Sequence, residues 1–408
     1  MTYFAGIDVS LRSVSICIVD EHGEVCHEAK TAAQPAAIAQ CLNSFSAEVK
    51  SVGLEAGTLT QFLAYGLQAA GFEVICMEAR QVKNTSAAMR NKTDRNDARG
   101  IAQILRTGWY SRVHVKSMHS HRVRALLASR KAILKKCIDL ENELRGLLRV
   151  FGICLPPRVG HGSFDAQVRQ TSAANELLAC ALNPLLDART VLYKTYLKLD
   201  NAIKGLVKAD PVCKLLMSVP GVGPVTALSF KAGVDDPGRF TSSRTVAAHF
   251  GLTPRRFQSG ESDNPGHISR AGDADVRSAL YVAAHSLLTR NEKWSSLKAW
   301  GIRLAKTRGH RRAVIAVARK LAVILHRMWV DVTEFCCGAP RNGQPSLPAK
   351  IDGHYFTMGK ELPFTNARAR DGRAAIFVTA LVIGPNHRRH GYPHDDLAAA
   401  RGNRAPSK

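Results

Sequence analysis

The chain has 408 residues, 45% of them hydrophobic, and a net charge of +24 at pH 7. This composition is that of a globular protein, and the length predicts two or three domains with a sizeable core. Such an excess of Lys and Arg is typical of a protein that binds a polyanion, most often nucleic acid. A ribosome-associated or simply basic protein is the alternative.

Three other classes of protein are disfavoured. The ten cysteines include no CxxC pair, which argues against a zinc ribbon and favours reduced thiols in a cytosolic protein. The first residues, "MTYFAGIDVSLRS", have no basic n-region and do not resemble a signal peptide. The apolar run at 374–384 is too short to span a bilayer. We therefore expect a soluble cytoplasmic protein.

Residues 1–116 are predicted to form an α/β domain with a mixed sheet, because strand and helix patterns alternate there. A hairpin is expected over 3–20, with its turn near residues 11–13. Further strands are expected in "VKSVGLEAG", ending at Glu55, and in "FEVICME". Helical spacing occurs at 33–48, in "LTQFLAYGLQAAG" and from Asp94 to a stop near Gly108.

Residues 117–208 are predicted to form a helical coiled-coil region. Two long segments carry apolar side chains at alternating spacings of three and four, and a loop rich in Pro, Gly and Ser separates them. The stripes are Leu126, Ile133, Cys137, Leu140, Leu144, Leu147 and Phe151, then Leu192, Tyr196, Leu199, Ile203 and Leu206. This spacing suits a helical hairpin or an intermolecular coiled coil, and plain packing explains it equally well.

Residues 209–335 are predicted to be mainly helical. The stretch "LMSVPGVGPVTALSF" resembles a helix-hairpin-helix, whose turn amides can bind a phosphate, although a simple tight turn also fits. A basic amphipathic helix closes the region, with an apolar face of Val314, Ala318, Leu321 and Leu325. Its other face carries the candidate nucleic-acid contacts Arg311, Arg312, Arg319 and Lys320.

From residue 336 to 408 the composition changes to Arg, Gly, Pro and His with little periodicity. A disordered basic tail is the favoured interpretation. The close spacing of His387, His390 and His394 suggests a metal site as the alternative.

Four acidic residues lie where a polyanion-binding protein should avoid them unless they hold a cation. Asp8 lies in the first predicted strand, Glu55 ends a later strand, and Asp94 and Asp97 begin a helix three residues apart. Carboxylate oxygens are ligands that Mg²⁺ prefers beside substrate phosphates, and two such ions can stabilise a phosphoryl transfer. Asp94 and Asp97 alone are explained as ordinary helix N-terminal acids. A ribonuclease-H-like strand order would favour the metal site.

An actin-like ATPase also opens with an aspartate on a strand. That fold needs a second glycine-rich phosphate loop after a later strand, and none is evident in the sequence.

Several motifs resemble those of a known family. "GIDVS", "GLEAG" and "NKTDRNDA" are similar to the DEDD catalytic set of the large insertion-sequence transposase family that pairs a RuvC-like domain with a serine-bearing transposase domain. "VPGVGPVTALSF", "RFTSSRTVAAHFGLTPRRFQSGES" and "HISRAGDADVRSALYVAAHSL" resemble its second domain. Together the motifs span about residues 3 to 335. "GIDVSLRS" lacks the lysine often found after the serine, and the tail matches nothing in the family core.

The resemblance implies roles for particular residues. Asp8, Glu55, Asp94 and Asp97 match the four acidic positions expected to bind magnesium. Ser259, in "RRFQSG", matches the serine expected to attack DNA.

The resemblance also implies partners. Family members are expected to form dimers to tetramers in which one protomer's serine joins another's acidic site. They are expected to use a bridge RNA that pairs with donor and target DNA, in a bacterial cytoplasm and at its nucleoid.

The resulting hypothesis is a DNA transposase or recombinase that works through a serine–phosphate intermediate. A free serine hydroxyl needs activation, and no His–Asp pair or GxSxG elbow accompanies Ser259 in sequence. Arg255 and Arg256 are candidates to hold phosphate oxygens. Without the motif, Ser242, Ser243 and Ser262 would rank near Ser259. The alternatives are a metal-dependent junction-resolving nuclease that uses water, or a non-catalytic nucleic-acid-binding protein.

Overall fold

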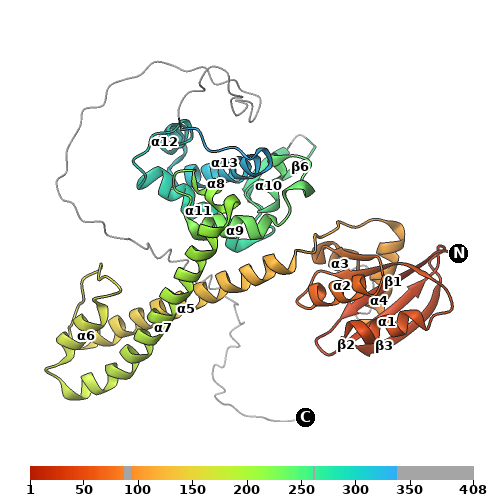
Figure 1. The fold of residues 1–408 in the computed structure, drawn as a ribbon, viewed down its shortest axis with the longest axis horizontal. Coiled ribbons are helices and arrows are strands. Elements are labelled where there is room, and N and C mark those ends of the chain that lie inside the picture. Colours follow the sequence, from red (N-terminus) through yellow and green to blue (C-terminus); the bar gives the residue numbers. More distant parts are fainter. Residues whose placement is uncertain (87–92, 261, 338–408) are drawn as a thin grey trace, which may run out of the picture. The chain divides into compact units, whose positions relative to one another are not determined.

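The computed structural model describes residues 1–86, 93–260 and 262–337 (Figure 1). The predicted tail lies outside the described residues from position 338 onward, and so do its three histidines. The predicted boundaries near residues 116 and 208 stay predictions.

The N-terminal region is built on a five-stranded mixed sheet. Its strands are β1 (Tyr3–Val9), β2 (Ser13–Val19), β3 (Val25–Ala32), β4 (Val49–Glu55) and β5 (Val74–Met77). Their order is β3-β2-β1-β4-β5, with β1 to β3 antiparallel and both β4 and β5 parallel to their neighbours. The expected α/β domain is confirmed, and the strand order is ribonuclease-H-like.

Helices cover both faces of this sheet. Helices α1 (Pro35–Asn43) and α2 (Thr60–Ala69) bury apolar side chains against the face that carries Ala5 and Ile7. Helix α4 (Asp94–Thr107) packs on the opposite face and ends, as predicted, at Gly108, whose φ of 71° is in the left-handed region that glycine adopts readily. Helix α3 (Ala79–Ser86) precedes it.

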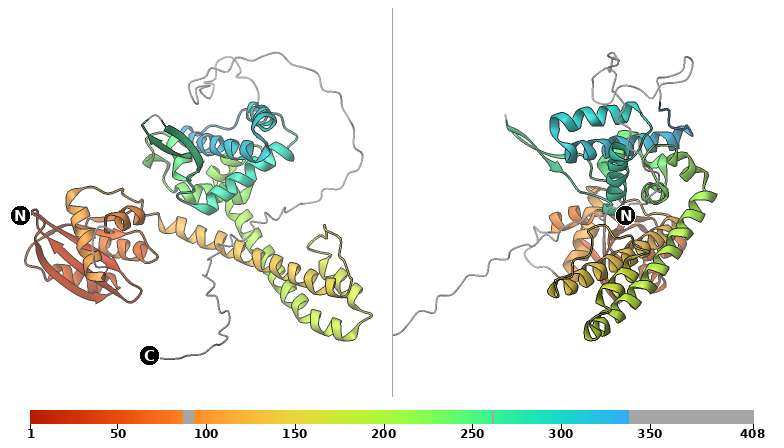
Figure 2. Two further views of the ribbon diagram at one scale, coloured as in Figure 1. Left: turned by 180° about the vertical axis from the view of Figure 1, so that it is seen from behind. Right: turned by 90° about the vertical axis from the view of Figure 1, so that its left-hand side faces the viewer.

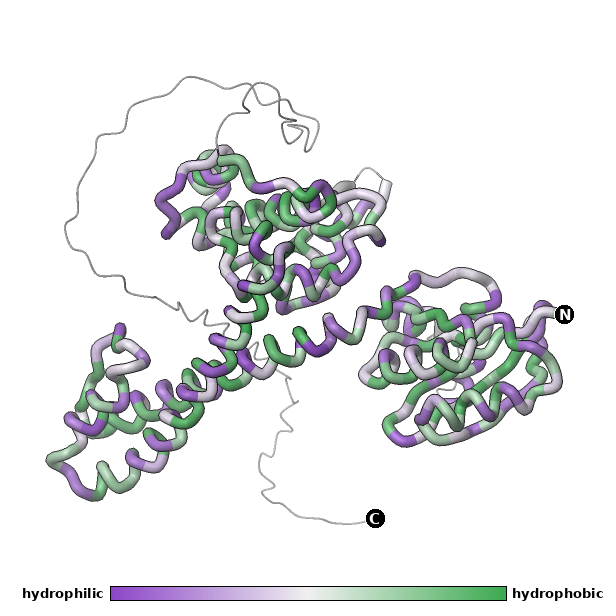
Figure 3. The backbone as a smooth tube through the Cα atoms, in the orientation of Figure 1, coloured by the Kyte–Doolittle hydropathy of each residue, from purple (hydrophilic) through white to green (hydrophobic). Residues whose placement is uncertain are grey.

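Two long helices follow, α5 (Met118–Val150) and α7 (Glu176–Ala209), and they pack against each other. Along both, hydrophilic and hydrophobic segments alternate (Figure 3). The predicted stripes hold in the middle of the helices, but Phe151 and Leu206 are exposed, and Val207 is buried where Leu206 was expected. Helix α6 (Phe164–Ser172), which the sequence did not indicate, packs on α7.

The last described region is mainly helical, as predicted. Its helices are α8 (Pro211–Met217), α9 (Pro224–Val234), the 3-10 turn η1 (Pro237–Arg239), α10 (Ser243–His249), α11 (Ala274–Thr289), α12 (Ser296–Arg308) and α13 (His310–Asp331). The apolar face predicted for α13 is completely buried. No helix in the described ranges is both long and apolar enough to cross a membrane.

An antiparallel hairpin interrupts these helices, formed by β6 (Pro254–Ser259) and β7 (Ser262–Ile268). We call this hairpin the serine ribbon. The sequence predicted a mainly helical region there and no strands. Figure 2 shows the ribbon extending away from the helices of its own region.

Candidate active site

The sheet register brings Asp8 and Glu55 to one edge. Strands β1 and β4 are parallel, and Ile7 lies opposite Leu54. The next residue of each strand is therefore an acid, at the carboxyl ends of two neighbouring strands. Both acids are half-buried.

Two glycines show which face of the sheet these acids share. A Cβ atom at Gly6 would lie 2.2 Å from the backbone nitrogen of Ala102 in α4. A Cβ at Gly53 would lie 3.2 Å from the side chain of Ile101, also in α4. Side chains alternate along a strand, so Asp8 and Glu55, each two residues further on, point to the face that α4 covers.

Helix α4 begins at the same edge. The Thr93 hydroxyl accepts a hydrogen bond from the Asn96 amide and caps the helix, with Asp94 and Asp97 in the first turn. Lys30 Nζ lies 3.9 Å from Asp94 Oδ2. Across the sheet, Lys30 pairs with Ser15 and Ser15 pairs with Asp8. The four acids, which we call the carboxylate edge, therefore lie at one end of the sheet.

The arginines that alternate with these acids in sequence are bound elsewhere. Arg95 and Arg99 both donate hydrogen bonds to the carboxylate of Glu28 on β3, with Arg99 Nη2 at 3.0 Å from Oε2. These bonds lower the pKa of Glu28 to about 2. Glu28 therefore holds the two guanidinium groups of α4 and keeps them from pairing with the acids of the carboxylate edge.

The carboxylate edge has the right chemistry for a divalent cation but is not a closed metal site. Within residues 1–86, 93–260 and 262–337, no three His, Cys, Asp or Glu side chains gather closely enough to hold a metal ion. The donors themselves are carboxylate oxygens, which Mg²⁺ and similar hard cations prefer. A cation would have to draw the four side chains together, with substrate phosphates as further ligands.

Ser259 is the last residue of β6 and lies opposite Ser262, at the tip of the serine ribbon. The turn uses Gly260 at a φ of 57°. Every residue of β6 is exposed to solvent. Arg255 Nη2 donates to the Ser269 carbonyl at 3.3 Å, and Arg256 lies next to it on the strand. Ser259 is thus open to a large partner.

Two of the other candidate serines have structural contacts. The Ser242 side chain caps α10 by accepting from the Arg244 amide. Ser243 Oγ lies 2.9 Å from Nδ1 of the buried His326. Ser262, like Ser259, is exposed on the ribbon.

The structure divides the predicted basic face of α13. Arg311 and Arg312 are exposed in the first turn of the helix. Arg319 and Lys320 lie two turns further along and are half-buried, with Lys320 Nζ 3.8 Å from the centre of the Trp300 ring. Cations are unfavourable at a helix N-terminus, so Arg311 and Arg312 are not explained by helix stability.

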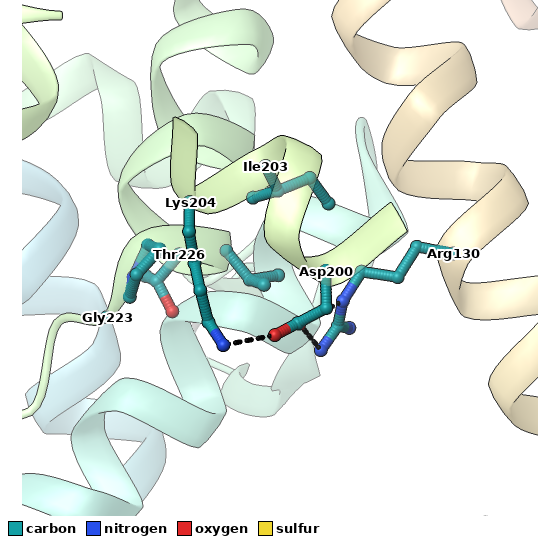
Figure 4. A pocket seen from close by; sticks show the side chains of 8 residues that line it. Arg130, Asp200, Ile203, Lys204, Gly223 and Thr226 are labelled. Atoms are coloured by element: carbon teal, nitrogen blue, oxygen red, sulfur yellow. Dashed lines mark hydrogen bonds and ion pairs between the residues drawn. The ribbon is translucent and has the colours of Figure 1, made fainter. Parts of the chain in front are cut away.

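The turn between α8 and α9 borders a pocket of about 240 Å³. Figure 4 shows Arg130 and Lys204 both directed at Asp200 in this pocket. Arg130 Nη2 lies 2.6 Å and Lys204 Nζ 2.8 Å from the Asp200 carboxylate. Because this carboxylate already binds both cations, the pocket adds no support to phosphate binding by the turn.

Sequence reasoning missed a polar junction where α5 begins. The Asp235 carboxylate accepts from Ser117 N at 2.8 Å, Ser117 Oγ at 2.5 Å and Ser120 Oγ at 2.5 Å, and His114 Nε2 lies 2.8 Å away. Burial alone would raise the pKa of Asp235, but these hydrogen bonds hold it well below its usual range. Lys116 Nζ donates to the Gly233 carbonyl at 2.5 Å, and burial lowers the pKa of Lys116 to about 8. No local motif signals contacts that join residues over 100 positions apart.

Comparison with known proteins places this geometry in a family. A family model for DEDD transposases of IS110, described as "Transposase", matches residues 5–153. A second model, "Transposase IS116/IS110/IS902 family", matches residues 213–299. The first match contains the carboxylate edge, and the second contains the serine ribbon.

Individual relatives agree. The transposase for insertion sequence element IS1111A of Coxiella burnetii is 30% identical over 82% of this chain and 91% of its own length. The pilin gene-inverting protein of Moraxella bovis is 29% identical over 31% of this chain and 41% of its own. Among solved structures, T. thermophilus RuvC in complex with a Holliday junction substrate matches 28% of this chain and 100% of its own, at 15% identity and a TM-score of 0.23.

Both halves of the chain match models of one family, and a relative matches over nearly its whole length. The chain belongs to the IS110 family of DEDD transposases.

Proposed function

We propose that this transposase cuts and exchanges DNA strands through a covalent bond between Ser259 and a DNA phosphate. The observation that carries the proposal is the position of Ser259 at the exposed tip of a ribbon flanked by Arg255 and Arg256. A nucleophile that must reach a phosphate within a bulky duplex needs such a position. Arg255, on the same face of β6 as Ser259, would donate charge-assisted hydrogen bonds to the oxygens of this phosphate, and Arg256, on the other face, would contact a neighbouring phosphate.

In the proposed first step, Ser259 Oγ attacks phosphorus and loses its proton. The bond between phosphorus and the oxygen of the leaving strand breaks, and that oxygen takes up a proton. In the second step, the hydroxyl end of the incoming strand loses its proton as it attacks the same phosphorus, and the displaced Ser259 Oγ takes up a proton. Each step exchanges one phosphoester for another, so rejoining needs no ATP.

Asp8, Glu55, Asp94 and Asp97 would hold magnesium for this reaction. A bound divalent cation supplies positive charge that stabilises the oxygens entering and leaving phosphorus. The four carboxylates would hold this cation, since without it they would repel the phosphate. Arg95 and Arg99, bound to Glu28, stay out of competition for these carboxylates.

We further propose that serine and carboxylates come from different protomers of a homo-oligomer, as the family resemblance implies. Ser259→Ala and Asp8→Asn proteins should each be inactive alone. When mixed before assembly on DNA, they should recover part of the strand exchange, because one composite site can then contain both intact groups. No recovery in any mixture would contradict the shared site.

The main alternative is a metal-dependent nuclease that uses water and leaves cut ends. One relative is named for gene inversion, a process in which every cut strand must be rejoined. This favours recombination over simple cleavage.

The test is to trap the covalent intermediate. A DNA substrate nicked near the cleavage point should lose the short fragment needed for rejoining and leave protein attached to DNA. Denaturing gels should show this adduct, and peptide mapping should place the bond in "RRFQSGESDNPGHISR". Ser259→Ala should lose the adduct but keep DNA binding, while Ser262→Ala on the same ribbon should keep both. Wild-type cleavage by Ser259→Ala would favour the water-using nuclease.

We also propose that a bridge RNA binds the protein and selects the DNA. The net charge of +24 suits RNA as well as DNA, and binding to either should weaken steeply with salt. The protein should co-purify with one transcript of its own element. In the cell it should be found in the cytoplasm, at the nucleoid. Changing the pairing loop of that RNA should direct recombination to a different target sequence. Efficient recombination after complete ribonuclease treatment would contradict the proposal that an RNA selects the DNA.

A further inference from the structure

The serine ribbon carries an exposed aromatic ring beside its candidate nucleophile. Phe257 is 63% exposed on a strand whose every residue faces solvent. Scattered exposed apolar residues are normal on protein surfaces. Phe257 differs because a two-stranded hairpin is only marginally stable in water without packing. A ring that could have strengthened the hairpin is left uncovered instead.

The backbone places this ring on the face of the ribbon that carries Ser259. A Cβ at Gly266 on β7 would lie 3.6 Å from the Arg255 Cβ and 3.6 Å from the Phe257 ring. Arg255 and Phe257 therefore project on one face, and alternation adds Ser259 to it. Because Gly266 has no side chain, nothing at that position covers the ring.

The surroundings of the ring identify the kind of partner. Arg255 and Arg256 directly precede Phe257, and the whole chain is strongly basic. Positive charge beside an aromatic ring is the combination with which proteins hold a phosphate backbone and stack on its bases. Apolar side chains next to basic ones also insert between base steps and kink duplex DNA.

The spacing agrees with contact near the cut. Phe257 and Ser259 are two residues apart on one strand, about 6.6 Å at 3.3 Å per residue. Successive bases of a DNA strand rise by about 3.4 Å. When Ser259 reaches a phosphate, the ring of Phe257 lies within one or two base steps of it.

We propose that Phe257 inserts against the bases next to the phosphate that Ser259 attacks and unstacks that step of the DNA. This inference rests on the proposed function, since it uses Ser259 to define the cleavage point. Phe257 acts as a positioning residue: it fixes the bent DNA so that the phosphate stands in front of Ser259 Oγ.

The test uses 2-aminopurine, whose fluorescence rises when it is unstacked, placed beside the scissile phosphate. The full-length protein, assembled with its nucleic acids, carries Ser259→Ala so that the DNA stays uncut. Binding should raise the fluorescence severalfold with Phe257 present. Phe257→Ala should remove most of the rise, Phe257→Tyr should keep it, and Phe62→Ala, which removes an exposed Phe on α2, should not change it.

With Ser259 intact, Phe257→Ala should slow adduct formation about 10- to 100-fold, because misplacement by about 1 Å can cost a factor of this size. DNA binding should change less than threefold.

Two results would overturn the inference. One is an unchanged fluorescence rise in Phe257→Ala. The other is a change in the oligomeric state of Phe257→Ala in sedimentation experiments, which would show that a second copy of the chain covers the ring. Because the fluorescence is read without cleavage, it decides the role of Phe257 even if the adduct maps to another serine.

Discussion

The carboxylate edge and the serine ribbon, two halves of one proposed site, are built in opposite ways. The edge stands on a buried sheet that α4 covers so closely that Gly6 has no room for a side chain. The ribbon is exposed along β6, and a Cβ at its turn glycine, Gly260, would meet nothing within 4 Å. The core fixes the backbone that carries the repelling carboxylates, whereas the strand that carries the proposed nucleophile is exposed along its whole length.

The largest expected effect is on strand exchange, when an acid of the carboxylate edge is replaced. Asp8→Asn should slow strand exchange about 1000-fold, as when an enzyme loses a group that stabilises transition-state charge. DNA binding should persist, because the Arg and Lys side chains remain. Single-turnover cleavage and filter binding measure the two properties. Asp139→Asn, which alters an exposed acid of α5, is the matched control. Full activity of Asp8→Asn, or of the wild type in excess chelator, would contradict the cation site.

The next effect is on the stability of the sheet and of α4, which together carry the carboxylate edge. Gly6→Ala places a methyl group 2.2 Å from the Ala102 backbone, so α4 must shift. We expect a loss of about 3 kcal/mol, at the upper end for overpacking. Amide hydrogen exchange in α4 should accelerate. If the amide hydrogens of α4 exchange as slowly in Gly6→Ala as in the wild type, helix and sheet are not in the close contact described here.

A smaller effect is expected at Glu28, which stabilises α4 through Arg95 and Arg99 but is not one of the four proposed metal ligands. The pKa of Glu28 is about 2 in the folded protein, below its ordinary value of 4.5. A lowered pKa contributes stability above pH 4.5, and this contribution is lost as the pH falls toward 2. Glu28→Gln should cost about 1 kcal/mol at pH 7, since Arg95 and Arg99 are more than a third exposed and water screens the pair.

Hydrogen exchange in α4 across pH 2 to 7 measures this loss. As the pH falls to about 2, the wild type and Glu28→Gln should converge, whereas Glu48→Gln, at an exposed position, should match the wild type throughout. A constant difference at every pH would contradict the charge-based explanation.

The smallest effect belongs to the ribbon. Gly260→Ala should destabilise the hairpin by roughly 1 kcal/mol, because φ there is in the left-handed region. Global thermal unfolding should not change, since a Cβ at Gly260 would meet nothing within 4 Å. Adduct formation should fall by less than about tenfold. A large drop in global stability would show that the ribbon is part of the core.

The sequence predicted β1, β2, β4 and β5 because each carries its own pattern of apolar residues and turns, but it missed β3, which has no fully buried residue. It could not supply the register that puts Asp8 beside Glu55, since register depends on pairing between distant segments. The ribbon escaped detection because a strand exposed at every residue has no apolar alternation. In α7 the stripe slipped from Leu206 to Val207, since a 3.6-residue helix drifts from a 3.5-residue repeat over many turns.

The junction at Asp235 has a mechanical consequence. Helix α5 contains 33 residues and is about 50 Å long at 1.5 Å per residue. One carboxylate clamps its first turn through Ser117 and Ser120. A tilt of about 5° at that clamp would swing the far end of the rod by about 4 Å, more than the length of a hydrogen bond. The hydrogen bonds of a single aspartate therefore fix the first turn of a rod about twenty times longer than the bonds themselves.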